Sequence, residues 1–192
     1  LKSCRQENSP LAAIASGIGL VTEDRKSQGL LLTQPIRINT TLSDVAAVSK
    51  AGWLQRVQET QIVKKLIQRL SVRCNSMEQN VGTLSGGNQQ KVIVSRWLHR
   101  NCDILLLDEP TRGVDVGARA EIYAELEQMT QSGKALLMVS SDLRELMQMA
   151  DRIGVMSNGQ LVNVFERGHW TEKSLLAAAF NDAHHQAEPL AA

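Results

Sequence analysis

Residues Ile104–Asp115 read ILLLDEPTRGVD, and a short distance before them Leu84–Lys91 reads LSGGNQQK. The first stretch opens with a continuous apolar run and then places two carboxylates, Asp108 and Glu109, next to each other. Such a run is typical of a strand covered on both faces of a parallel sheet. Ligands of α/β folds bind at the carboxyl ends of these strands. The stretch therefore predicts an α/β domain whose sheet presents Asp108 and Glu109 at a binding edge.

The upstream stretch predicts a helix that begins at a glycine-rich turn. Ser85 is predicted to cap this helix, which runs to about His99. Gly86 and Gly87 have no Cβ, so an anion can approach their backbone closely. The N–H groups and dipole of a helix N-terminus favour negative charge there. An ordinary capped helix with a glycine-rich turn is the alternative for this turn taken alone.

Strands and helices alternate along the rest of the chain, which indicates an α/β class with a largely parallel sheet. The predicted strands are Gly17–Thr22, Asp103–Leu107, Ala135–Ser140, Ile153–Met156 and Gln160–Phe165, the last two joined by an Asn158-Gly159 hairpin turn. The predicted helices are a short one from Pro10, then Asn39–Val48, Trp53–Val72, Ser85–His99, Gly117–Ser132, Asp142–Ala150 and Thr171–Phe180. TEDRKSQG, ending at Gly29, is predicted as a loop. The segment between Ile38 and Val81 has no strand signal and is predicted as a helical insertion. The tail from about 181 to 192 is predicted to be disordered.

Composition excludes several classes of protein. The 192 residues carry a formal net charge of +1, which gives no basic field for nucleic acid. Aromatic residues make up only 3%, which argues against a base-stacking surface. No apolar run approaches the ~20 residues that span a bilayer, and the N-terminal residues lack a signal-peptide core. Cys4, Cys74 and Cys102 lack metal-ligand spacing and indicate free thiols in a reducing compartment.

Four stretches together resemble one family. They are VTEDRKSQGL (Val21–Leu30), LSGGNQQK, DEPTRGVDVGARAEIY (Asp108–Tyr123) and VSSDLREL (Val139–Leu146). The chain resembles the second, C-terminal ATP-binding domain of the tandem ABC ATPases that power sugar importers of the ribose, galactose and xylose type. The resemblance runs from about Pro10 to Phe180. It implies a P-loop NTPase-like fold over residues 1–192, with a helical subdomain at about 38–100.

The resemblance also implies roles for individual residues, with ATP and Mg²⁺ as cofactors. Glu109 would polarise the attacking water, and Asp108 would hold Mg²⁺ through its waters. Glu23 stands where most ABC domains have the Q-loop glutamine and would also ligate Mg²⁺. The signature residues that would contact a nucleotide held by another domain are Ser85, Gly86, Gly87 and Gln89. Asp115 would lie in the D-loop, and Ser141 would occupy the switch position, where histidine is usual.

The sequence contains no G-x-x-x-x-G-K-[ST] phosphate loop. Ser132–Ala135 (SGKA) imitates its end, but Gln128 stands where the first glycine is required, and Ala135 offers no hydroxyl. We therefore expect an ABC ATPase domain truncated before its Q-loop and lacking the phosphate loop. Such a chain is expected to be inactive alone and to assist ATP turnover only through Ser85–Gly87.

The expected partners are the first ATP-binding domain of the tandem ATPase and the transmembrane permease subunits, with no nucleic acid. The expected location is cytoplasmic, peripheral on the inner face of the cell membrane. Two other interpretations stay open. One is a non-catalytic remnant or interaction module from a truncated gene. The other is an ABC ATPase without a transporter, such as a DNA-repair or translation factor, which the net charge disfavours.

Overall fold

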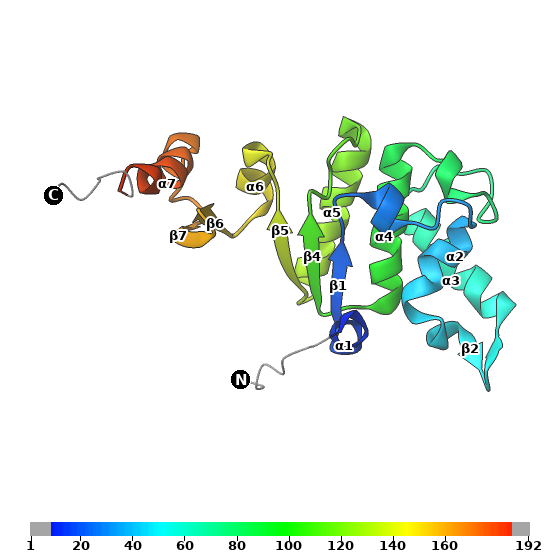
Figure 1. Ribbon diagram of the computed structural model, residues 1–192. Helices are drawn as coiled ribbons and strands as arrows, with labels where there is room; N and C mark the ends of the chain where they lie inside the picture. The colour runs from blue at the N-terminus through cyan, green and yellow to red at the C-terminus, as the bar shows by residue number, and fades with distance from the viewer. Residues whose placement is uncertain (1–8, 186–192) are drawn as a thin grey trace. The chain divides into compact units, whose positions relative to one another are not determined.

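The computed structural model describes residues 9–185, with side chains described to residue 180. The chain divides into two compact units, Leu1–Val139 and Ser140–Ala192. Each unit has its own secondary structure and is described separately below. The ribbon in Figure 1 shows the elements of both units.

A parallel sheet forms the centre of the first unit. Its strands are β1 (Ile18–Val21), β4 (Ile104–Asp108) and β5 (Ala135–Val139), in the order β1-β4-β5. Val21 pairs with Leu107, and Leu107 pairs with Met138, so all three strands end at the same edge. The short helix α1 (Pro10–Ala15) precedes β1 and is capped by Ser9. This sheet confirms the predicted α/β class.

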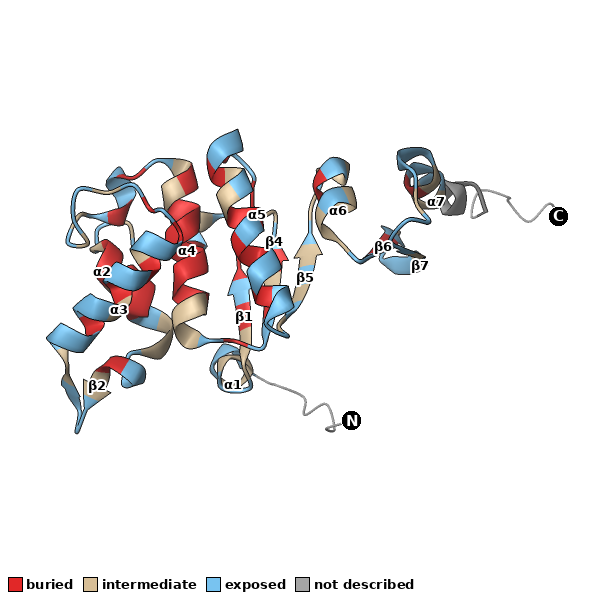
Figure 2. Ribbon diagram, turned by 180° about the vertical axis from the view of Figure 1, so that it is seen from behind, coloured by how far each residue is buried: buried red, intermediate tan, exposed pale blue. Residues whose placement is uncertain are grey.

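Two helices pack against each other and cover one face of the sheet. They are α4 (Gly86–Arg100) and α5 (Val116–Gln131), each of which leads into the next strand. Leu105 and Leu107 are buried beneath them. The approach is close, because a Cβ on Gly19 of β1 would lie 2.7 Å from the ring of Trp97 in α4. Figure 2 shows buried residues along most of α4.

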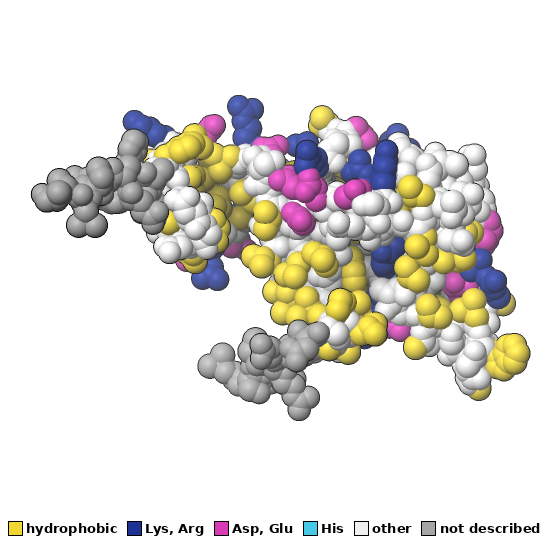
Figure 3. All heavy atoms as spheres, viewed as in Figure 1, with side chains coloured by type: hydrophobic (Ala, Val, Ile, Leu, Met, Phe, Trp, Pro, Cys, Tyr) yellow, Lys and Arg dark blue, Asp and Glu magenta, His cyan; other side chains and the backbone are white. Residues whose placement is uncertain are grey.

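The opposite face of the sheet carries exposed apolar side chains. Leu137 and Val139 of β5 are 62% and 60% exposed, and Leu20 and Ile104 are also exposed. Figure 3 shows these strands as a hydrophobic area on the surface. The prediction that these strands are covered on both faces is therefore wrong for the described residues. Parallel strands added in one direction by right-handed crossovers place their helices on one face only.

The helical part lies between β1 and β4 in the chain. It consists of α2 (Ile36–Thr41), two short 3₁₀ turns, η2 (Leu42–Asp44) and η3 (Ala46–Val48), and α3 (Arg56–Arg69), followed by the 3₁₀ turn η4 (Val81–Thr83). Helix α3 begins later than predicted, because the residues before it form a small hairpin of β2 (Ser49–Lys50) and β3 (Trp53–Leu54). It also ends earlier, at Arg69, and Ser71 beyond it has a positive φ. The prediction of no strand in this segment was wrong. Ala51 and Gly52, both with positive φ, supply the backbone twist that tight hairpin turns require.

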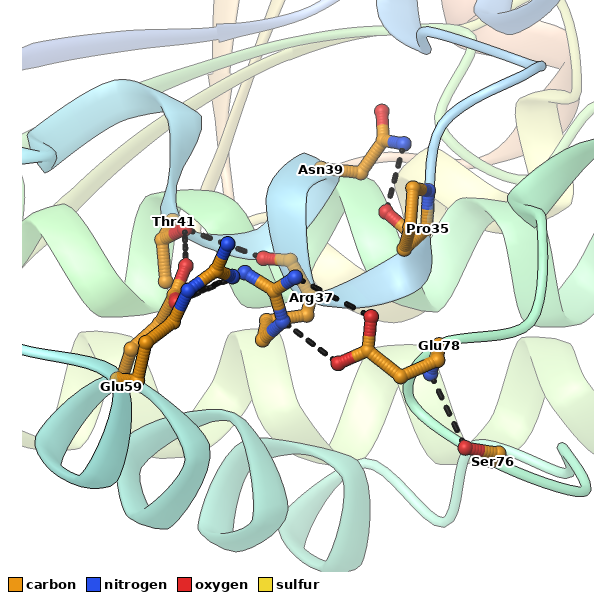
Figure 4. Close-up of polar contacts among 8 residues, drawn as sticks. Pro35, Arg37, Asn39, Thr41, Glu59, Ser76 and Glu78 are labelled. Atoms are coloured by element: carbon orange, nitrogen blue, oxygen red, sulfur yellow. Dashed lines mark hydrogen bonds and ion pairs between the residues drawn. The ribbon is translucent and has the colours of Figure 1, made fainter. Parts of the chain in front are cut away.

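A buried arginine ties the helical part together (Figure 4). Arg37 of α2 is 6% exposed and donates from Nη1 to the buried carboxylate of Glu59 in α3, at 2.8 Å. Its Nε and Nη2 donate to both carboxylate oxygens of Glu78, at 2.7 and 3.1 Å. Hydrogen bonding from Arg37 lowers the pKa of Glu78, and the same bond raises the pKa of Arg37. The cluster joins α2, α3 and the segment before α4.

The second unit contains α6 (Leu143–Met149), the antiparallel pair β6 (Arg152–Ser157) and β7 (Gln160–Glu166), and α7 (Glu172–His185). Asn158 and Gly159 both have positive φ and form the hairpin turn as predicted. Leu175 of α7 packs on Ile153 and Val155 of the hairpin. Helix α7 continues past its predicted end at Phe180, and residues 186–192 lie outside the described part.

Candidate functional site

The predicted acidic residues lie at the carboxyl ends of two neighbouring parallel strands. Asp108 ends β4 and is exposed, and Glu23 follows the end of the neighbouring strand β1. Glu109 follows Asp108 with a φ of 47°, and its backbone N–H donates to Val139 O at 2.9 Å. A left-handed backbone at a residue other than glycine is uncommon and costs on the order of 1–3 kcal/mol. Ala51, Ser71, Asn101 and Asn158 also have positive φ, so the backbone of Glu109 does not test its role, which stays a prediction.

Glu23 is paired with an arginine. Its Oε1 accepts from Nη1 of Arg112, and both side chains are largely solvent-exposed. The residue predicted as a magnesium ligand is therefore held by a cation of this chain. A metal would have to compete with Arg112 for the Glu23 carboxylate.

The segment TEDRKSQG is not the loop that was predicted. Residues Arg25–Gly29 form a single π-helical turn, η1. Asp24 caps this turn by accepting from the backbone N–H groups of Lys26 and Ser27, at 3.0 and 3.1 Å. The hydroxyl of Ser27 also donates to Asp24, and these bonds lower the pKa of Asp24. The composition of the segment indicated a loop. The Asp24 side chain instead accepts hydrogen bonds from the backbone amides that follow it, and these bonds stabilise a helical turn.

Ser85, Gly86 and Gly87, called the signature turn here, lie at the N-terminus of α4 as predicted. The predicted mode of capping is wrong, because the Ser85 side chain accepts no bond from the α4 backbone. Instead, its Oγ accepts from Nδ2 of Asn88 at 2.9 Å. The first turn of α4 contains no acidic residue, so the positive end of the helix dipole is not neutralised by its own side chains.

The two glycines of the signature turn lie in close contact with other parts of the chain, and the contact is tightest at Gly87. A Cβ on Gly86 would lie 2.8 Å from Nη2 of Arg25 and 3.1 Å from Gly113 O. A Cβ on Gly87 would lie 2.6 Å from Cβ of Ala118, in α5. The sequence analysis attributed both glycines to the approach of a phosphate. The structure supplies a second reason, which is the close packing of α4 against the segment that follows β4.

Gln89 is buried in this chain. Its side chain is only 4% exposed, and its Nε2 donates to Val81 O at 3.3 Å. The nucleotide contact of Gln89 stays a prediction. The neighbouring Asn88 is half-buried, and its Oδ1 accepts from the backbone N–H of Arg73 at 2.8 Å. Asn88 therefore links the signature turn to the segment before it, through Ser85 and Arg73.

Asp115 lies at the N-terminus of α5, next to the signature turn. Its Oδ1 accepts from Ala118 N–H at 2.9 Å, and this bond lowers the pKa of Asp115. Its Oδ2 would lie 2.9 Å from a Cβ on Gly87. Ser141 belongs to the second unit, directly before Asp142, which caps α6. The D-loop role of Asp115 and the switch role of Ser141 stay predictions.

Residues 9–185 include no group of three or more His, Cys, Asp or Glu side chains arranged to hold a metal ion. Magnesium in nucleotide sites commonly takes one or two carboxylates and completes its shell with phosphate oxygens and water. Asp108 and Glu23 stay predicted ligands of such a cation, and Arg112 occupies the Glu23 carboxylate in this structure. Cys74 and Cys102 are free thiols, and burial raises the pKa of both. In the described part of the chain no helix is both long and apolar enough to span a membrane.

Comparison with known proteins identifies the family of the chain. The model of a family described as ABC transporter matches residues 7–112, more than half of the chain. The chain belongs to the ABC transporter family. It is 45% identical over 172 residues to a putative ribose/galactose/methyl galactoside import ATP-binding protein of Rhizobium meliloti. It is 40% identical over 176 residues to the ribose import ATP-binding protein RbsA of Halalkalibacterium halodurans.

These matches cover about nine-tenths of this ABC chain but about a third of each relative, 34% and 35%. The chain thus spans about a third of the length of the curated relatives that it matches. Among solved structures, the ADP conformation of MJ1267, an ATP-binding cassette of an ABC transporter, matches with a TM-score of 0.66. That match has 18% identity and covers 94% of this chain and 72% of the other. It establishes the cassette fold.

Proposed function

We propose that this chain is the second ATP-binding cassette of a sugar importer and lends its signature turn to an ATP held by another cassette. The observation that carries the proposal is the N-terminus of α4, where Gly86 and Gly87 open a 15-residue helix with no acidic residue in its first turn. Such an N-terminus binds phosphate through its N–H groups and its dipole. The resemblance of the chain to ribose import proteins supports a sugar or related small solute as cargo.

The missing phosphate loop defines what the chain does in this proposal. None of the 192 residues forms a G-x-x-x-x-G-K-[ST] loop, which would supply the lysine and amide cradle for the β- and γ-phosphates. The chain alone therefore hydrolyses no ATP. Its partner is the first ATP-binding domain of a tandem ATPase, whose phosphate loop faces Ser85–Gly87.

A second site would form at the chain's own sheet edge if a phosphate loop were brought to it. Asp108 would then hold Mg²⁺ through water, with Glu23 as a further ligand once Arg112 has moved away. Glu109 would orient the attacking water. At the switch position, Ser141 has a hydroxyl in place of the charged or tautomeric donor that histidine supplies.

The remaining parts of the proposal concern location and docking. The helical subdomain at about 38–100 docks the transmembrane permease subunits. The cassette then lies in the cytoplasm on the inner face of the membrane. The alternative is a non-catalytic remnant, which the exposed apolar side chains of Leu137 and Val139 favour. Cooperative unfolding with retained helix content would count against a remnant.

The test is magnesium-dependent ATP hydrolysis by the chain mixed with a phosphate-loop cassette of the same importer group. The chain alone should be inactive, and mixing should stimulate hydrolysis at least tenfold. Ser85→Glu should abolish the stimulation, because it places a carboxylate against the incoming phosphate. This substitution keeps the fold, since acidic groups are tolerated at a helix N-terminus.

Gln68→Glu is the matched control, because it adds the same charge at an exposed position of α3. It should leave the stimulation unchanged. Hydrolysis by the chain alone that disappears in Glu109→Gln would overturn the proposal. Nucleic-acid binding with a steep salt dependence would instead support a cassette without a transporter.

A further inference from the structure

The guanidinium of Arg25 lies where two functional segments meet. Its Nη1 donates to Arg112 O at 2.9 Å, and its Nη2 lies 3.4 Å from Gly113 O. The same Nη2 would lie 2.8 Å from a Cβ on Gly86. One side chain therefore touches the signature turn and also the backbone that follows Asp108 and Glu109.

Arg25 is held in place by the η1 turn. Asp24 caps the turn at its start, and Gly29 ends it against α4. There, a Cβ on Gly29 would lie 2.8 Å from Cδ1 of Ile93, and Nη1 of the buried Arg96 donates to Gly29 O at 2.7 Å. Arg25 therefore projects from a turn whose backbone is held at both ends.

Each of two segments, residues 23–25 and residues 112–113, contributes an arginine that contacts the other segment. Arg25 reaches the carbonyl groups of residues 112 and 113, while Arg112 returns an ion pair to Glu23. The two segments are thus joined twice, close to the acidic residues of the sheet edge. A third contact brings Gly87 against Asp115, the cap of α5.

The partners of Arg25 are backbone carbonyls. In the described part of the chain no carboxylate pairs with it, and its Nε is buried without a hydrogen bond. A planar guanidinium that spans two successive carbonyls is sensitive to their relative orientation, which a single ammonium is not. The contacts of Arg25 therefore depend on the backbone conformation of residues 112 and 113.

We propose that Arg25 is a positioning residue that couples the signature turn to the segment Arg112–Asp115. A phosphate bound at Ser85–Gly87 would then fix the backbone that follows Asp108 and Glu109, through Arg25. The inference rests on the proposed function, in which the signature turn and these carboxylates serve different ATP molecules. Arg25 would connect the two sites within one chain.

The first arm of the test measures amide hydrogen exchange in the chain alone. Three backbone amides report on the junction through their hydrogen bonds: Gln89 to Ser85 O, Arg112 to Glu109 O, and Val114 to Thr111 O. Arg25→Ala should accelerate the exchange of all three at least tenfold, and Arg25→Lys should do so less. Lys26→Ala removes the same charge from the exposed neighbour and should change none of them. Unchanged exchange in Arg25→Ala would overturn the proposal.

The second arm adds a phosphate-loop cassette and MgATP. In the wild type, protection should rise at Gln89 and also at Arg112 and Val114. In Arg25→Ala, the gain at Gln89 should persist while the gain at Arg112 and Val114 is lost, a separation that a general loss of stability would not produce. Equal gains in both chains would contradict the coupling. No gain at Gln89 in the wild type would refute the proposed function, while the first arm still decides the role of Arg25.

Folding of the variants is checked within the same experiment. The amides of the buried part of α5, around Leu126, serve as the internal reference. If Arg25→Ala accelerates these amides as well, the decision passes to Arg25→Lys, which keeps the charge but lacks the planar fork of the guanidinium. Coupling then requires that Arg25→Lys lose the gain at Arg112 and Val114. Retention of that gain would overturn the proposal.

Discussion

At the scale of single residues, Gly87 of the signature turn shows where the packing of the chain requires glycine. Gly87 faces α5 so closely that a Cβ would lie 2.6 Å from Cβ of Ala118. Gly117, at the start of α5, has room, because its nearest neighbour would be 3.4 Å away. The two positions belong to helix starts that face each other, yet only one of them excludes a methyl group.

We expect Gly87→Ala to destabilise the chain by about 1–3 kcal/mol, as overpacked sites do. Gly117→Ala should be neutral or stabilise it by up to about 1 kcal/mol, because alanine favours helix. Urea unfolding followed by circular dichroism measures both. Equal stability of the two variants would contradict the close packing of α4 against α5.

The sequence could predict which residues lie at the binding edge but not which of them face it. The positions of Asp108 and Gly86 could be predicted, because Asp108 ends a strand and Gly86 begins a helix. The burial of Gln89 does not, because α4 is covered on several sides, and its buried positions include Lys91 and Arg96. The sequence does not reveal that such polar residues are buried, because their type alone predicts exposure. The ion pair of Glu23 with Arg112 joins residues far apart in sequence and left no local pattern.

At the scale of elements, α2 and α3 are joined by a buried ion pair rather than by apolar contacts alone. Arg37 and Glu59 are 7% and 2% exposed at their side chains. Arg37→Met leaves Glu59 buried without its main partner and should cost about 3–5 kcal/mol. Arg56→Met is the control, since Arg56 is 64% exposed at 3.6 Å from Glu59 and should cost less than about 1 kcal/mol. Chemical denaturation of both variants tests this difference, and similar costs would contradict it.

The pH dependence of this cluster has a definite sign. Hydrogen bonding from Arg37 lowers the pKa of Glu78 below its ordinary value of 4.5. The stabilisation by the Glu78 carboxylate is therefore full above pH 4.5 and is lost as the pH falls through the lowered pKa. We expect the difference in unfolding free energy between wild type and Glu78→Gln to shrink as the pH falls below 4.5. In the Arg37→Met background this pH dependence should disappear, and its persistence would exclude Arg37 as the cause.

Elements were predicted where their pattern is local. The Asn158-Gly159 turn and the helices after Asp142 and Thr171 were confirmed, because their turn and capping residues are specific. The hairpin that ends in Trp53 was missed, because its strands contain only two residues each. Two residues are too few to show the alternation of apolar and polar side chains by which a strand is predicted.

At the scale of the whole molecule, the apolar face of the sheet decides how the chain behaves in isolation. Leu137 and Val139 stand on an edge strand, and such surfaces promote association. The apolar composition of these strands predicted that they are covered on both faces, and this is wrong for the described residues, because composition does not say which chain segment covers each face.

We expect the double substitution Leu137→Lys and Val139→Lys to reduce self-association of the isolated chain at least tenfold. Sedimentation velocity measures this effect. Val116→Lys is the control, because Val116 is 84% exposed at the start of α5 and off the sheet face. Equal loss of association in the control would show that charge alone, rather than the sheet face, is responsible.

The central claim is that this chain completes an ATP site held by another cassette. Calorimetric titration of MgATP tests it most directly, with the chain alone, with a phosphate-loop cassette alone, and with the two mixed. We expect no saturable binding by the chain alone at millimolar ATP, and at least tenfold tighter binding by the mixture than by the other cassette. Micromolar binding by the chain alone, or no tightening in the mixture, would contradict the account.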